Sequence, residues 1–152
     1  MKNYVKKALR DLLHQAPLKP IHGPTKFERP EYGKKVQYAR DDTSKTINKK
    51  LKSKIQKVCG KFLYSGRAID NTTMHALNEL CIDASTATQE TQEALIYFMD
   101  YLATHPDANI IFRRSDMQLQ IDSDAAYLVQ KLARSRAGGY HFLGDHLSLI
   151  HI

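Results

Sequence analysis

Residues 117–143 read MQLQIDSDAAYLVQKLARSRAGGYHFL, the stretch on which the fold prediction rests. At its start apolar and polar residues alternate, a two-residue period typical of a half-buried strand, here over about 117–123. Alternate side chains of a strand share a face, so Asp122 and Asp124 are expected side by side where this strand ends. A second apolar run predicts another strand over about 139–144.

Between these two strands we expect a polar connection that carries Arg134 and Arg136. Upstream, β-branched and aromatic residues predict a further short strand over about 109–113, joined to the next strand by a turn. The C-terminal part is therefore expected to be a small antiparallel sheet.

A three- to four-residue apolar period upstream of this sheet predicts helices. Four amphipathic helices are expected, over about 2–14, 47–66, 71–84 and 89–104. Four of the five prolines fall between residues 15 and 46, which we interpret as an extended connection. Helices followed by strands make the expected fold class α+β.

The predicted helix over 47–66 keeps its lysines outside its apolar stripe. Such a face can lie along a nucleic-acid backbone, or it can simply be solvated. The candidate nucleic-acid-binding residues are Lys49, Lys50, Lys54, Lys57, Lys61, Arg134 and Arg136. These cations lack interleaved aromatic residues, which favours contact with phosphates over base stacking.

The net charge of +7 is unevenly distributed. Residues 1–67 hold 18 Lys and Arg against 5 Asp and Glu, a net charge of +13, whereas residues 68–152 hold 5 against 11, a net charge of −6. A basic first half suits a polyanionic partner, and an acidic second half would repel phosphate unless divalent cations intervene.

No apolar run is long enough for a membrane span, and the N-terminus lacks the apolar core of a secretion signal. We therefore expect an intracellular protein, cytoplasmic or nuclear, that is not secreted and has no membrane partner. Cys59 and Cys81 fall on separate predicted helices, and we interpret both as small buried hydrophobic residues.

The motif around Asp124 resembles the start of the ribonuclease H domain in copia-like retrotransposon polyproteins. The family pattern is Ser-Asp-Ala-x-aromatic, a spacer, and then Arg-Ser-x-x-Gly-Tyr-x-Phe, and it is similar to residues 123–127 and 134–142 here. The helices from about residue 47 to 105 are also similar to the tail of the reverse transcriptase in such elements. The resemblance implies an incomplete ribonuclease H-like fold at the C-terminal end.

By this resemblance, Asp124 is the first of four acidic positions that hold two Mg²⁺ or Mn²⁺ ions and hydrolyse the RNA strand of an RNA–DNA hybrid. Asp124 is therefore the candidate catalytic and metal-binding residue, and Asp122 either assists it or is solvated. The chain departs from the family because Asp145 is the only acidic residue after Asp124. We expect the chain alone to bind no metal and to lack catalysis.

The expected organisation has four parts. Residues 1–46 form a helix and connection, residues 47–106 a helical reverse transcriptase tail, and residues 107–145 the first ribonuclease H-like strands. Residues 146–152 are similar to translated sequencing adapter and are interpreted as a non-native tail of a truncated frame.

The main functional hypothesis is a fragment of a reverse transcriptase and ribonuclease H polyprotein, whose partners are RNA–DNA hybrid and the rest of that polyprotein. The alternatives are a small basic nucleic-acid-binding protein without catalysis and an interaction module with no nucleic-acid role.

Overall fold

The structure is a computed structural model that describes residues 3–27, 33, 42–111, 114–130 and 134–144. Within these residues it contains four α-helices, one 3₁₀ turn and a two-stranded antiparallel sheet. The chain divides into two compact units. Met1–Glu28 and Thr43–Asn109 form the helical unit, and Arg29–Asp42 and Ile110–Ile152 form the strand unit. The α+β class is confirmed.

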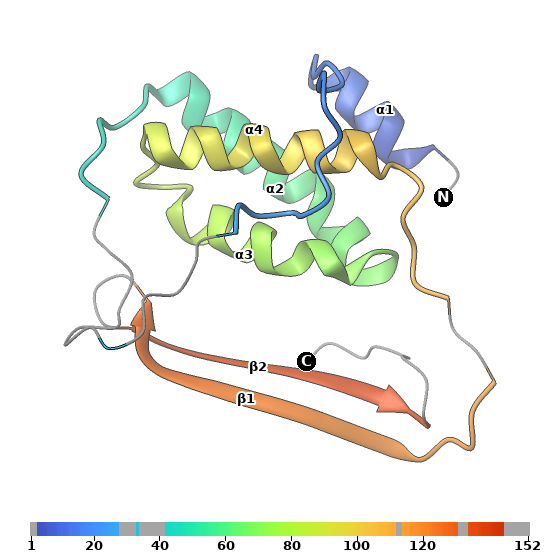
Figure 1. Cartoon of the computed structure of the whole chain (residues 1–152). Coiled ribbons are helices and arrows are strands. Elements are labelled where there is room, and N and C mark those ends of the chain that lie inside the picture. Colours follow the sequence, from blue (N-terminus) through green and yellow to red (C-terminus); the bar gives the residue numbers. More distant parts are fainter. Residues whose placement is uncertain (1–2, 28–32, 34–41, 112–113, 131–133, 145–152) are drawn as a thin grey trace. The chain divides into compact units, whose positions relative to one another are not determined.

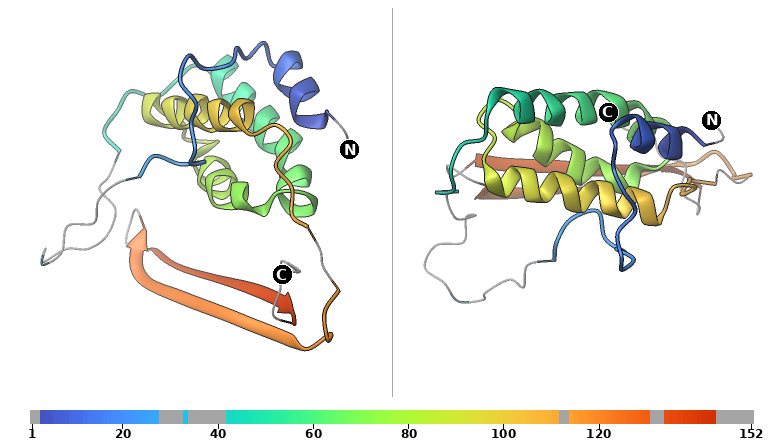
Figure 2. Two further views of the ribbon diagram at one scale, coloured as in Figure 1. Left: turned by 45° about the vertical axis from the view of Figure 1, so that its right-hand side comes forward. Right: turned by 90° about the horizontal axis from the view of Figure 1, so that it is seen from above.

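The helical unit packs its helices side by side, as Figures 1 and 2 show. The helices are α1 (Tyr4–Asp11), α2 (Lys49–Ala68), α3 (Met74–Asp83) and α4 (Gln89–Thr104), and the 3₁₀ turn Asn71–Thr73 precedes α3. All four were predicted, and α4 has the predicted bounds. The predicted helix over 71–84 divides because Asp70 caps the 3₁₀ turn by accepting a hydrogen bond from the Thr72 amide at 3.2 Å.

Side-chain caps explain where the two long helices begin. The Asn48 side chain accepts a hydrogen bond from the Leu51 amide at 2.9 Å and starts α2. Thr88 and Thr91 form a reciprocal capping box at the start of α4. Such caps satisfy backbone amides that have no partner inside the helix.

All four helices bury apolar side chains in one core. At its centre the Phe62 ring meets the Phe98 ring edge-on, with centroids 6.1 Å apart, and the Tyr4 ring meets Phe62 in the same manner. The largest fully buried side chains are Phe62, Phe98, Ile55, Leu77, Met99 and Val58. Burial of these side chains is the main favourable contribution to the stability of the unit.

The connection after α1 lies along α4. The Ile21 amide donates to the Thr104 hydroxyl at 3.1 Å, and one ring nitrogen of His22 lies 3.2 Å from one of His105. Further along, Lys26 approaches Glu93 at 3.8 Å. After His14 contacts Asp100, the chain reaches the C-terminal end of α4 at Thr104 and His105 and then turns towards its N-terminal end at Glu93 (Figure 1). This connection was predicted, but the surface on which it docks was not.

In the part of the strand unit that the structure describes, β1 (Leu119–Gln130) and β2 (Arg134–Leu143) form an antiparallel hairpin. The register pairs Leu119 with Leu143 and Asp124 with Gly138, and it shifts between Ala126 and Gln130. Among the described residues, no helix is long and apolar enough to cross a membrane.

Two sequence predictions about the strands were wrong in detail. The expected polar connection is mostly strand, because backbone pairing accommodates charged side chains when they face solvent. A strand was expected over 109–113, but residues 109–111 are not in a strand. Residues 112–113 lie outside the described residues. The hairpin therefore joins β1 to β2 rather than joining residues 109–113 to β1. The proposed tail, residues 146–152, also lies outside the described residues.

Candidate nucleic-acid interface

A stripe of lysines follows α2 on the flank of its core-facing side. The core-facing residues Ile55, Val58 and Phe62 recur every three to four residues. Lysines recur with the same period at another angle around the helix, so their side chains form one row. This row, the lysine stripe, consists of Lys50, Lys54, Lys57 and Lys61.

The stripe is accessible along its length, with Lys50 and Lys57 exposed and Lys54 and Lys61 half-buried. The Lys61 ammonium group lies 3.2 Å from an Asp11 carboxylate oxygen. This pair is solvent-exposed on the Asp11 side, so it stabilises the fold weakly and leaves Lys61 available to a competing anion.

The N-terminal end of α2 concentrates positive charge. Lys49 and Lys50 begin the helix, both are exposed, and its first turn contains no acidic residue. The backbone amides of the first turn give a helix N-terminus a partial positive charge. Lysine side chains near this end are therefore in an unfavourable electrostatic position. A phosphate group near Lys49 and Lys50 would relieve that repulsion, whereas a solvated face gains nothing from this arrangement.

Lys52 of α2 lies outside the lysine stripe and contacts the end of α3. The Lys52 ammonium group donates to the Ser85 carbonyl at 3.0 Å, which ties α2 to the end of α3. Lys52 was not among the candidate residues. The five candidate lysines all lie on α2. Lys52 lies on the same helix but differs from them because its ammonium group is bound to the Ser85 carbonyl.

The two candidate arginines belong to the strand unit. Arg134 begins β2 and is exposed, and Arg136 is half-buried opposite Ala126. Strand pairing places Arg136 diagonally across from Asp124 on the same face of the hairpin. The candidate cations therefore fall into two groups, one on each unit.

Asp122 and Asp124 lie on one face of β1, as predicted, and both side chains are exposed. Asp122 is opposite Tyr140, and Asp124 is opposite Gly138. Among the described residues, no group of three or more His, Cys, Asp or Glu side chains is placed to hold a metal ion. Two exposed carboxylates do not fit a two-ion centre, which requires several converging oxygen ligands.

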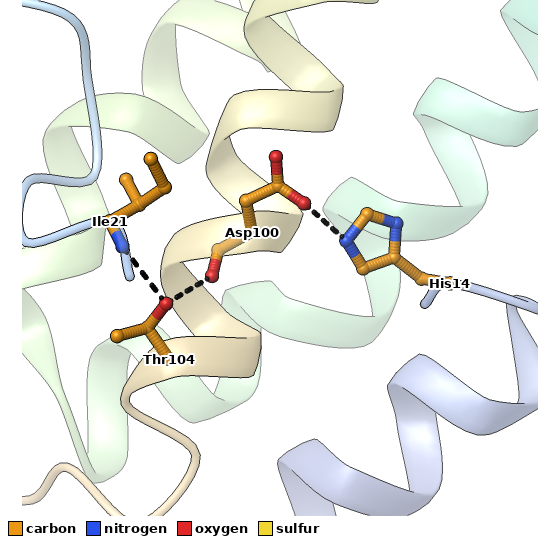
Figure 3. Close-up of polar contacts among 4 residues, drawn as sticks. All are labelled: His14, Ile21, Asp100 and Thr104. Carbon is orange, nitrogen blue, oxygen red and sulfur yellow. Dashed lines mark hydrogen bonds and ion pairs between the residues drawn. The ribbon is translucent and has the colours of Figure 1, made fainter. Parts of the chain in front are cut away.

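Sequence reasoning missed a half-buried polar contact of the helical unit. The His14 ring lies 2.8 Å from an Asp100 carboxylate oxygen, and the Thr104 hydroxyl donates to the Asp100 carbonyl one turn further along α4 (Figure 3). No spacing in the sequence links residues 14 and 100, so no local signal could have revealed this pair.

The prediction that both cysteines are buried was half right. Cys59 is buried on α2, whereas Cys81 on α3 is exposed.

Comparisons of the chain with models of protein families, with curated proteins and with solved structures find no match.

Proposed function

We propose that this chain binds the sugar–phosphate backbone of nucleic acid through the lysine stripe of α2, without cleaving it. The main support is that Lys50, Lys54, Lys57 and Lys61 occupy one side of α2. The first turn of this helix contains no acidic residue. Lysines arranged in a row on a rigid helix contact successive phosphates and carry no base specificity. Release of counterions would drive such binding and make it sensitive to salt.

The preferred ligand in this proposal is an RNA–DNA hybrid, and the chain is a piece of a copia-like reverse transcriptase and ribonuclease H polyprotein. The motif around Asp124 supports this origin, as does the exposed position of Asp124 on β1. In the intact parent, Asp124 would bind Mg²⁺ or Mn²⁺ together with carboxylates from later in the fold. The parent would copy RNA into DNA and hydrolyse the RNA of the hybrid.

A filter-binding titration with RNA–DNA hybrid at two or more salt concentrations tests the binding. Replacing Lys50, Lys54 and Lys57 by Gln is expected to weaken binding at low salt and to reduce the slope of log affinity against log salt by about three. Lys61 is kept because its ammonium group contacts Asp11.

A matched variant controls for net charge. Lys6, Lys19 and Lys26 all lie in the helical unit, are exposed and are absent from the stripe. Their replacement by Gln removes the same charge, and we expect a much smaller loss of affinity. Equal losses in both triple variants would mean that net charge rather than the stripe drives binding. Binding that is absent at all salt concentrations would favour an interaction module instead.

Cleavage is measured in the same samples with Mg²⁺ added. The expected result is intact RNA, with the same affinity for the wild type and for Asp124→Asn. Metal-dependent cleavage by the wild type that persists in Asp124→Asn would exclude Asp124 from the proposed role.

The alternative of an independent basic binding protein predicts the same titration. The genomic sequence on both sides distinguishes this alternative from the polyprotein hypothesis, which requires an in-frame polymerase motif upstream and further acidic residues downstream.

A further inference from the structure

The two cysteines of the chain lie on α2 and α3, which pack against each other. Cys59 lies on α2 and Cys81 on α3, and the two thiols are near enough for Cys81 to raise the pKa of Cys59. Twenty-two positions separate them in the sequence, so only the packing of the helices makes them neighbours.

Contacts on both sides of the cysteines fix the register of these helices. At one end, a Cβ on Gly66 would lie 2.9 Å from a Leu77 methyl carbon and 3.1 Å from the Met74 sulfur. At the other end, Lys52 donates to the Ser85 carbonyl. The two helices are therefore antiparallel, and residues 59 and 81 occupy facing positions between these contacts. The close approach at Gly66 brings the helix backbones near each other, as a disulfide requires.

The two thiols differ in their access to solvent. Cys81 is exposed, whereas Cys59 is 6% exposed. Burial, assisted by the hydrogen bond to Cys81 and the charge of its thiolate, raises the pKa of Cys59 to about 12. Because Cys81 is exposed and Cys59 is buried, an oxidant in solution reaches and oxidises Cys81 first. Cys59 is then the neighbouring thiol that can resolve the oxidised Cys81.

We propose that Cys59 and Cys81 form a reversible intramolecular disulfide and constitute a modification site for hydrogen peroxide. The Cys81 thiolate attacks one peroxide oxygen and the O–O bond breaks, which yields a sulfenic acid and hydroxide. The Cys59 sulfur then attacks the Cys81 sulfur and expels a second hydroxide, and the thiol protons convert both hydroxides to water. Two thiols lose two electrons in total, and one peroxide is reduced to two waters.

The disulfide would join α2 to α3 and close a loop of about 20 residues that includes the Asp70-capped turn. Closing a loop of this size restricts the unfolded chain. We expect the thermal midpoint of the helical unit to rise by roughly 10 °C on oxidation and to return on reduction. This inference is independent of nucleic-acid binding, because the lysine stripe lies on another side of α2.

The test oxidises the full reduced chain with a small excess of hydrogen peroxide, blocks free thiols by alkylation, and digests with trypsin without a reductant. Cys59 falls in the peptide of residues 58–61 and Cys81 in the peptide of residues 68–113. The expected result is one cross-linked species of these two peptides, from monomeric protein, that separates on reduction. Two alkylated cysteines after oxidation, or chains linked to each other through Cys81, would overturn the proposal.

Two variants assign the order of the steps. Cys59→Ala keeps the exposed thiol, and we expect it to accumulate a Cys81 sulfenic acid that a dimedone probe labels. Cys81→Ser keeps only the buried thiol, and we expect little labelling and no change in thermal midpoint with peroxide. Stronger labelling of Cys81→Ser than of Cys59→Ala would contradict the assignment of Cys81 as the first residue oxidised. Circular dichroism checks that both variants are folded, and the wild-type peptide map decides the proposal without them.

Discussion

The His14 side chain joins the segment after α1 to α4 through its contact with Asp100 (Figure 3). The two side chains are 11% and 22% exposed, so water competes poorly for their hydrogen-bonding groups. A second histidine of the same connection, His22, contacts His105 but is exposed. The two histidines thus make similar contacts with α4 in different environments, and they provide a comparison at the scale of single residues.

Replacement of His14 by Ala is expected to lower the free energy of unfolding by about 1–2 kcal/mol, because it leaves a half-buried carboxylate without its partner. Neither histidine lies in a helix, so helix propensity does not affect the comparison. His22→Ala is expected to cost less than about 0.5 kcal/mol, as is usual for exposed positions. Urea unfolding of the three proteins at one pH measures both values. Similar losses in the two variants would show that the burial of the Asp100 contact does not stabilise the fold.

At the scale of elements, two glycines of α2 show how packing overrides helix propensity. Gly60 is exposed, and a Cβ built there meets nothing within 4 Å. Gly66 is buried, and a Cβ there would lie 2.9 Å from a Leu77 methyl carbon, closer than real Cβ atoms come to a neighbour. From the sequence alone, both glycines are expected to lower the stability of the helix. In the structure only Gly66 lies where a larger side chain would clash with a neighbouring helix.

Gly60→Ala is expected to stabilise the helical unit by roughly 0.5–1 kcal/mol, because alanine restricts the unfolded chain and favours helix. Gly66→Ala is expected to destabilise it by roughly 1–3 kcal/mol, because Leu77 and Met74 must move apart from α2. Thermal unfolding followed by circular dichroism distinguishes the two signs. Stabilisation by both substitutions would show that α3 yields readily and that Gly66 is not required for close packing.

The hairpin shows the same limit of local reasoning in the strand unit. Alternation predicted only the first part of β1, because residues 125–130 do not alternate and the following cations suggested a loop. In the structure β1 continues through this region, with Ala125 and Ala126 paired to β2 and a register shift before Gln130. The shared face of Asp122 and Asp124 was predictable, because it follows from strand geometry alone.

At the scale of the whole molecule, the apolar core belongs to one unit. Every buried residue of the core cluster lies between Ala8 and Leu102, on α1 to α4 or in the turns that join them. The strand unit contributes a single two-stranded hairpin among the described residues, and an isolated hairpin of this kind is marginally stable in water. The stability of the chain should therefore reside in the helical unit.

A chain of residues 1–109 is expected to keep this stability. It retains α1 to α4 with every core residue, so its thermal midpoint should lie within about 4 °C of the full chain, and its unfolding should be cooperative. Far-ultraviolet circular dichroism of both proteins during heating makes the comparison. Failure of the shorter chain to fold, or a much lower midpoint, would mean that the helical core depends on the strand unit.

The four helices, the α+β class, the lysine stripe and the common face of Asp122 and Asp124 could be predicted from the sequence. All of these follow from periodicity within a single element, where near neighbours in the chain are also neighbours in space. Only the tertiary structure decided which surface the connection after α1 covers, that His14 meets Asp100, and that Cys59 meets Cys81. These contacts join residues from 22 to 86 positions apart, and they arise from the packing of segments that are distant in the chain, which leaves no periodic trace in the sequence.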